Sequence, residues 1–294
     1  MAITGTADAS HGNLKKLNRR RSFIAHLKRE QVFSLSLKKM VWFNQAALFL
    51  GSALLVADVL PVGAVRTIIP KTSFDSQSNF DADWNYLYPW GTDHNGGARM
   101  TKDNVKFSGG TLTITANKVS GQPQATHGGQ KININYLSGA IHAKEHFNVS
   151  RGGGYDFSAE IKATTTKGTW PAFWLTAVQG WPPEIDMAEW KGSGKVSFNT
   201  FNTSSIVAAK DVTYPSPGNF HSFKCETRDL NGKDVQAKFY MDGNLITTQV
   251  GAGYFGKPMY LIINLQMEGS SGSPGPTSNT EYQVRNLEVL SYNP

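Results

Sequence analysis

The chain has 294 residues, of which 17% are charged, 11% are aromatic and 29 are glycine. This composition provides enough apolar side chains for a buried core and excludes a disordered protein. The formal net charge of +7 is concentrated near the N-terminus, because residues 1–64 contain nine Lys or Arg and three Asp or Glu, which leaves +1 for the rest. A nearly neutral body carries no basic footprint, so we expect no nucleic-acid partner.

Residues 1–64 have the features of an export signal. The first 39 residues are polar and basic, and residues 46–57 (AALFLGSALLVA) form an uncharged run of twelve. Such a run suits the apolar region of a signal peptide and is short for a bilayer-spanning helix. Small residues at 63–64 predict cleavage before Val65 and a secreted, extracellular protein. The alternatives are an uncleaved membrane anchor at residues 40–60, a start at Met40 instead of Met1, and a mitochondrial transit peptide.

Residues 65–294 are predicted to form a single all-β domain, because short alternating segments recur between Gly, Pro, Asn and Asp. In chain order, strands are predicted at 110–116, 139–147, 155–163, 172–177, 184–190, 195–202, 222–227, 235–241, 245–250, 259–267 and 282–290. The dipeptide Asp242-Gly243 predicts a β-hairpin, and no segment after residue 70 shows sustained helical periodicity. We therefore expect a sandwich of two antiparallel sheets, one of them bent into a groove for a long linear ligand.

Residues 181–190 (WPPEIDMAEW) place three carboxylates within six positions of a predicted strand. Glu184 and Asp186 share one face, because side chains alternate along a strand. Glu189 would face the opposite side of a regular strand. One extra residue at Met187-Ala188, forming a β-bulge, would return it to the face of the other two, and we predict this bulge. Three buried acids in a row repel each other, so the arrangement needs a chemical reason.

Retaining glycoside hydrolysis provides such a reason. It needs one ionised carboxylate as nucleophile and one protonated carboxylic acid as proton donor. A middle carboxylate can hydrogen-bond a neighbour and keep the two pKa values apart. A solvated acidic strand face is the structural alternative, but the interleaved apolar residues and flanking tryptophans argue against it. Calcium binding is a further possibility, although calcium ligands usually come from flexible turns. We expect no catalytic metal and no required cofactor, and we allow for a structural calcium ion.

The segment Glu184-Ile-Asp-Met-Ala-Glu189 resembles the signature of glycoside hydrolase family 16, the laminarinase, lichenase, agarase and carrageenase group. Six further segments, on both sides of this motif, are similar to the family and occur in family order over about residues 75–294: YLSGAIH, GYDFSAEIK, GTWPAFWL, NFHSF, FYMDG and YLIINLQ. The resemblance implies a concanavalin-like β-jelly roll with a concave substrate groove. It also implies that Glu184 is the nucleophile, Asp186 the assisting carboxylate and Glu189 the acid/base of an endo-acting double displacement.

A linear β-linked polysaccharide is the substrate that the resemblance implies, with β-1,3-glucan or mixed β-1,3/1,4-glucan as the first choice. Two departures from the family leave this specificity open: Ala140 stands where the family often has Arg, and the loop at residues 90–99 is unlike that of the commoner laminarinases. Galactans of the agar or carrageenan type would also suit such a groove. A lectin-like binding module, a transglycosylase and a polysaccharide lyase are compatible with the same fold. The complete set of acids favours a hydrolase.

Aromatic and polar residues near the acids are the candidates for sugar binding, because sugar rings stack on aromatic faces and their hydroxyls need polar partners. The candidates are Trp170, Trp174, Trp190, Trp90, His94, Arg99, Asn202 and Gln266. Core packing is the alternative role for each tryptophan. The loop that contains Trp90, His94 and Arg99 is a plausible rim of the groove. We expect the enzyme to be a monomer.

Overall fold

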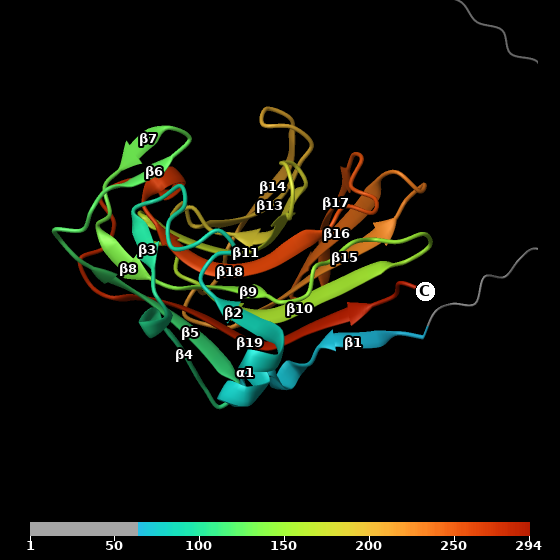
Figure 1. Cartoon of the computed structure of the whole chain (residues 1–294), viewed down its shortest axis with the longest axis horizontal. Coiled ribbons are helices and arrows are strands. Elements are labelled where there is room, and N and C mark those ends of the chain that lie inside the picture. The colour runs from blue at the N-terminus through green and yellow to red at the C-terminus, as the bar shows by residue number, and fades with distance from the viewer. Residues whose placement is uncertain (1–63) are drawn as a thin grey trace, which may run out of the picture. The chain divides into compact units, whose positions relative to one another are not determined.

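The structure, a computed structural model, describes residues 64–294, and the predicted leader and its alternative anchor at residues 40–60 fall outside them. The described residues form two large facing sheets and a separate small hairpin (Figure 1). They all belong to one compact unit. None of the helices in this part of the chain has the length and apolar character needed to cross a bilayer.

The larger sheet has ten strands and forms the convex layer. Its main path is β17 (Asn244–Gly251), β16 (Val235–Met241), β15 (His221–Asp229), β10 (Gly154–Lys162), β19 (Thr280–Ser291), β5 (Thr111–Lys118), β8 (Tyr136–Ser138) and β3 (Ala98–Met100). At its edges, β1 (Arg66–Ile69) pairs with β19 and β4 (Val105–Ser108) pairs with β5. All pairs are antiparallel except β3–β8, where both short strands run in the same direction. The predicted antiparallel sandwich is therefore confirmed apart from this one edge.

The seven-stranded sheet carries the acidic segment near its middle. Its order is β14 (Val207–Thr213), β13 (Lys195–Phe201), β12 (Glu184–Glu189), β11 (Thr169–Ala177), β18 (Met259–Met267), β9 (Ala140–Ala143) and β2 (Trp84–Tyr86). The strands β11 and β18 are visibly curved in Figure 1. The β13–β14 hairpin rises on one side of them, and the separate hairpin of β6 (Ala125–His127) and β7 (Gln130–Ile132) rises on the other.

Local backbone geometry explains the turns and the short helices. Asp242 and Gly243 both have positive φ, +49° and +76°, as the tight β16–β17 hairpin requires, which confirms the predicted turn. The helix α1 (Gln77–Asp83) begins after Ser76, whose hydroxyl accepts a hydrogen bond from the backbone N–H of Asn79. Short 3-10 helices span Lys71–Phe74, Lys102–Asn104 and Gly269–Ser271.

The hydrophobic core lies between the two large sheets, and its packing holds the strands of the smaller sheet that carry the acidic residues. On β16, buried Ala237 and Phe239 alternate with half-buried Gln236 and Lys238, as expected for a strand with one solvent-exposed face. On β11, in contrast, all residues but the last are buried. Its inner face packs into the core, and its outer face forms the floor of a cleft. Such a strand is held on both sides, which makes it a rigid base for a site.

All eleven predicted strands correspond to observed ones, namely β5, β9 to β13 and β15 to β19. The remaining strands and α1 were not predicted. Most of these missed strands have only three or four residues, too few for alternation to stand out. The longer β14 is mostly exposed on both faces, so its sequence lacks an apolar side. The elements that sequence reasoning missed are thus mainly those at the sheet edges and around the cleft.

Candidate active site

A β-bulge in β12 brings the three acids to one face of the sheet. Opposite β11, Trp174 pairs with Asp186 and Phe173 pairs with Ala188, so Met187 is the extra residue. The pairing with β13 shifts between Asp186 and Glu189 in the same way. The predicted bulge at Met187-Ala188 is therefore confirmed, and Glu184, Asp186 and Glu189 all line the same cleft.

Glu189 is almost fully buried and receives three donors. The indole N–H of Trp170 donates to its Oε1 at 2.6 Å. The side-chain amide of Asn199 donates to Oε2 at 3.1 Å, and the ammonium of Lys191 lies 2.6 Å from the same oxygen. Donors from β11, from β13 and from the residues after β12 thus fix the orientation of this carboxyl group.

Asp186 lies between the other two acids and is the most deeply buried of the three. Burial, followed by the charges of Glu189 and Glu184, raises its pKa well above the ordinary value. The Asn199 amide donates to its Oδ2 at 2.9 Å, which partly offsets that rise. Asp186 is therefore the member of the row best suited to carry a proton. A neutral group between Glu184 and Glu189 reduces the repulsion that three carboxylates would have.

Glu184 begins β12 and is tied down through both its side chain and its backbone. The indole N–H of Trp181 donates to its Oε2 at 2.8 Å. Its backbone N–H donates to the hydroxyl of Tyr254 at 2.9 Å, and that hydroxyl also hydrogen-bonds the carbonyl of Phe201. Burial raises the pKa of Glu184 to about 7, and Glu189 adds to the rise while the Trp181 hydrogen bond opposes it. The carboxyl therefore changes its charge near neutral pH.

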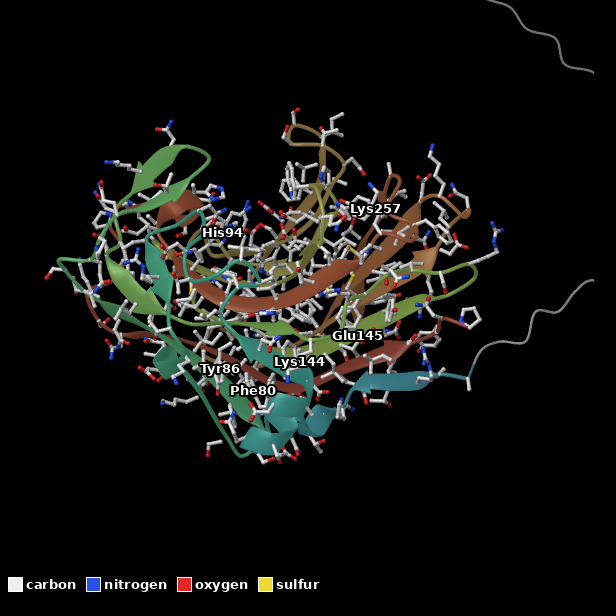
Figure 2. The ribbon with its side chains drawn as sticks, in the orientation of Figure 1. Phe80, Tyr86, His94, Lys144, Glu145 and Lys257 are labelled. Carbon is white, nitrogen blue, oxygen red and sulfur yellow. The ribbon has the colours of Figure 1, made fainter. Side chains whose placement is uncertain are left out.

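The cleft above the acids has a volume of about 990 Å³. Strands β11, β12 and β18 supply its floor, with Trp170, Trp174 and Asn264 beside the acids. The loop at residues 92–95 and His127 of β6 line one side, and Trp181 and Phe201 line it next to β12 and β13. Figure 2 shows His94 above the ribbons of β11 and β18, on the side of the β6–β7 hairpin. The cleft is large enough to hold several sugar rings of a polymer.

Three of the four candidate tryptophans line this cleft. Trp170 and Trp174 lie on its floor, where the indole N–H of Trp174 donates to Asn264 at 2.7 Å. Trp90 is 46% exposed and stacks on Tyr88 at the rim. The assignment of Trp190 to sugar binding was wrong. Its side chain is 0% exposed and packs edge-on against core aromatics, because the residue after Glu189 points through the sheet to the opposite face.

Of the polar candidates, His94 and Gln266 line the cleft and Arg99 does not. His94 lines the cleft between aromatic rings, and burial, reinforced by His127, lowers its pKa to about 4, so its imidazole is neutral at neutral pH. Gln266 also lines the cleft, although its Oε1 accepts from the backbone N–H groups of Ala98 and Met267. Arg99 lies behind this wall and forms a two-pronged pair with Asp93, at 2.8 and 2.9 Å.

Asn202 is not among the residues that line the cleft. Its amide oxygen accepts from the backbone N–H of Ala252 at 2.7 Å, and its nitrogen donates to the carbonyl of Val250 at 3.2 Å. The prediction that Asn202 binds sugar is therefore wrong. Its role is structural, because the oxygen and the nitrogen of its side-chain amide both bind the backbone at the end of β17. The strand alternation places the neighbouring Phe201 in the cleft instead.

Sequence reasoning missed several residues of the site. They are Trp181, Lys191, Asn199, Phe201 and Asn264. Two of them had a usable signal. Trp181 lies three residues before Glu184, and Lys191 lies two residues after Glu189, where strand alternation would again place a side chain on the cleft face. The other three come from neighbouring strands, and their register cannot be read from the acidic segment.

Comparison with known proteins identifies the family. The family model described as glycosyl hydrolases family 16 matches residues 92–284. The chain belongs to this family. As a family 16 member, it is a glycoside hydrolase that acts within β-linked glycans, which confirms the predicted enzyme class.

Two curated family 16 relatives differ in how much of their length is shared. The chain is 52% identical over 231 residues to the galactan endo-beta-1,3-galactanase of Flammulina velutipes, covering 78% of this chain and 92% of the relative. It is 31% identical over 192 residues to the endo-1,3-1,4-beta-glycanase EglC of Rhizobium meliloti (strain 1021), covering 62% of this chain and 38% of the relative.

The fold is shared with solved glucanase structures. The endo-1,3-beta-glucanase of Streptomyces sioyaensis superposes with a TM-score of 0.61 at 21% identity, covering 80% of this chain and 99% of that one. At this identity the likeness concerns the fold, and it confirms the predicted β-jelly roll.

Proposed function

We propose that this family 16 enzyme is an endo-acting, retaining hydrolase of β-1,3-linked galactan. The main support for this proposal is the 52% identity to the Flammulina velutipes galactanase over 92% of that protein. The β-glucan that the sequence first favoured becomes the second candidate. It is supported by the 31% identity to a 1,3-1,4-beta-glycanase, which covers only 38% of that relative.

The charge of the cleft supports a neutral polymer as substrate. Four acidic residues line it, Asp93 and the three acids of β12, and Lys191 is the one Lys or Arg among the described residues that line it. Arg99 approaches from behind but is engaged by Asp93. A strongly sulfated galactan would therefore meet repulsion in this cleft, whereas an uncharged chain of sugars would not.

The proposed reaction has two steps. In the first, ionised Glu184 attacks the anomeric carbon while protonated Glu189 gives its proton to the departing glycosidic oxygen. This forms an ester between Glu184 and the sugar and releases one end of the polymer. In the second, ionised Glu189 takes a proton from water, the resulting hydroxide attacks the anomeric carbon, and Glu184 leaves as a carboxylate. Two inversions at the same carbon leave the β configuration unchanged.

The surroundings of the acids support these roles. Glu184 is held by Trp181 through one oxygen, and its backbone is held by Tyr254, so the carboxylate is presented in a fixed direction. Glu189 is oriented by Trp170 and by two further donors. Groups fixed on strands, rather than on loops, keep the reacting atoms in position for both steps.

The test is to assay reducing ends released by the full chain and by Glu184→Gln from β-1,3-galactan, laminarin, barley β-glucan, agarose and carrageenan. We expect the highest kcat/KM on β-1,3-galactan and loss of cleavage in Glu184→Gln, with binding to the polymer retained. Glu160→Gln, on the convex face, is the matched control and should remain active. Faster cleavage of laminarin than of galactan would overturn the substrate, and an active Glu184→Gln enzyme would overturn the mechanism.

We also propose that the enzyme is secreted, monomeric and independent of cofactors. Two carboxylates supply both the nucleophile and the proton transfers, so the reaction scheme assigns no step to a metal ion. A chelator should leave kcat unchanged, and sedimentation should give a single species of about the mass of the chain. A melting temperature that falls on chelation would indicate the structural calcium ion that we allowed for.

A further inference from the structure

Two segments of the chain have the acceptor pattern for N-linked glycosylation, in which asparagine is followed two residues later by serine or threonine. They are Asn148-Val-Ser150 and Asn202-Thr-Ser204. An N-linked glycan is bulky and polar, so it has to project from the surface of the folded protein. The surroundings of the two asparagines therefore decide which of them can carry a glycan in the folded enzyme.

Asn148 lies in the connection between β9 and β10, and its side chain points into solvent. Its neighbours Phe147 and Val149 are 0% and 1% exposed, whereas Asn148 itself is exposed. Its backbone carbonyl accepts a hydrogen bond from the side-chain amide of Asn293 at 3.0 Å. Its own side-chain amide has no hydrogen-bond partner among the described residues. The backbone is thus held in place while the amide is free to carry a substituent.

Ser150, the last residue of this acceptor pattern, has a hydroxyl that the packing does not explain. The hydroxyl is buried and has no hydrogen-bond partner in the described part of the chain. Only the backbone N–H of Ser150 is engaged, as a donor to Oδ1 of Asn293 at 3.1 Å. A buried hydroxyl without a partner opposes folding, so alanine would suit this position better. The acceptor pattern does require a hydroxyl here, and glycosylation of Asn148 would account for the serine.

Asn202 has the opposite surroundings. It is half-buried, its amide oxygen accepts from the N–H of Ala252, and its amide nitrogen donates to the carbonyl of Val250. A glycan would replace one hydrogen of this nitrogen and place a sugar where the amide packs against β17. The preceding residue, Phe201, lines the cleft, whereas none of the residues 144–153 is among those that line it. A glycan at Asn202 would therefore disturb a wall of the cleft.

We propose that the folded, secreted enzyme carries an N-linked glycan at Asn148 and none at Asn202. This rests on the proposed secretion, because the donor is a lipid-linked oligosaccharide of the secretory pathway. The amide nitrogen of Asn148 forms a bond to the anomeric carbon of the oligosaccharide, the lipid diphosphate leaves with the electron pair of the broken bond, and the nitrogen loses a proton. A chain glycosylated at Asn202 before folding could not close both amide hydrogen bonds, so it would be depleted from the secreted protein.

The test is to produce the full chain in yeast behind a yeast secretion signal and to recover it from the medium and from microsomes. An endoglycosidase that leaves one N-acetylglucosamine on each glycosylated asparagine marks the sites for peptide mass mapping. We expect one marked site in the secreted protein, at Asn148, and its loss in Asn148→Gln and Ser150→Ala. The matched control is Ser204→Ala, which removes the second pattern without touching the amide of Asn202 and should leave the mass of the glycan unchanged. A mark at Asn202 in the secreted protein, or none at Asn148, would overturn the proposal.

A second measurement tests the argument from packing. In protein produced in bacteria without a glycan, Ser150→Ala should melt at the same temperature as the wild type or higher, because it removes an unpartnered buried hydroxyl. A lower melting temperature would show that this hydroxyl supports the fold, and it would remove that part of the case. Failure of the other proposals is visible separately. A glycosylated protein that cleaves no polymer contradicts the proposed hydrolase, and one that needs the yeast signal contradicts the proposed leader, while both leave the site at Asn148 standing.

Discussion

Replacing Glu184 with glutamine should stabilise the fold, and more strongly at pH 8 than at pH 4. Burial raises the pKa of Glu184 to about 7, from 4.5 for an ordinary glutamate. A carboxyl group whose pKa is raised by folding contributes stability below its unfolded pKa, and this contribution is lost as the pH rises through the folded pKa. Glutamine has nearly the same shape and stays neutral, so the variant escapes this loss.

The size of the effect follows from the shift. A rise from 4.5 to about 7 corresponds to about 3 kcal/mol between a fully protonated and a fully ionised group. The hydrogen bond from the Trp181 indole to the side chain can persist, because the glutamine amide oxygen also accepts it. The free energy of unfolding should therefore be similar in the two proteins at pH 4 and about 3 kcal/mol larger in Glu184→Gln at pH 8.

Urea unfolding at the two pH values, followed by tryptophan fluorescence, measures this difference. Glu160→Gln is a control of opposite sign, because hydrogen bonds from Asn286 and Arg285 lower the pKa of Glu160 on folding. That variant should lose stability at pH 8 relative to the wild type and change less at pH 4. A Glu184→Gln variant whose stability differs from the wild type by the same amount at both pH values would refute the reasoning.

Three further predictions concern the residues around the acids. Trp190→Ala should lower the free energy of unfolding by about 3–5 kcal/mol, because a fully buried indole is lost; Trp90→Ala at the rim should change it far less but raise KM, and the opposite pattern would contradict their placement. Asn199→Ala removes a donor from both Asp186 and Glu189 and should lower kcat/KM about tenfold or more with an unchanged circular dichroism spectrum. His94, with its pKa lowered to about 4, should show the NMR shifts of a neutral imidazole at pH 6, and a titration near 6.5 would place it in water instead.

The acidic strand is the part of the site that could be predicted from sequence. The period of two along β12, together with the chemical cost of burying acids on opposite faces, requires an extra residue between Asp186 and Glu189. The observed register shift at Met187 agrees with this reasoning. The bulge is predictable because side-chain direction in a strand depends on neighbours in the sequence, not on distant segments.

The same rule, applied one residue further, would have corrected the assignment of Trp190. If Glu189 faces the cleft, then the next side chain must face the core, and the one after it must return to the cleft. Closeness to the acids in sequence favours Trp190 as a sugar-binding residue and gives no reason to prefer Lys191. The structure reverses both choices, with Trp190 0% exposed and Lys191 in contact with Glu189. Closeness along a strand is therefore a poor guide to a shared face.

The walls and the supporting donors could not be predicted, because they depend on long-range pairing. Asn199 reaches the acids only through the register of β13 against β12, and Asn264 reaches Trp174 across 90 positions of the chain. The β6–β7 hairpin that supplies His127 is built from two strands of three residues each. Such short segments carry no periodicity, and their position over the sheet is set by the loops on either side.

The bulge links the stability of this protein to its chemistry. A regular strand would place Glu189 in the core and Trp190 in the cleft, which would bury a charge and expose a large apolar ring, and both changes oppose folding. With the bulge, the ring fills the space between the sheets while Glu189 meets Trp170, Asn199 and Lys191 on the other face. The core packing of one residue thus fixes the orientation of its neighbour. The register of β12 that is best for folding is also the register that assembles the three acids.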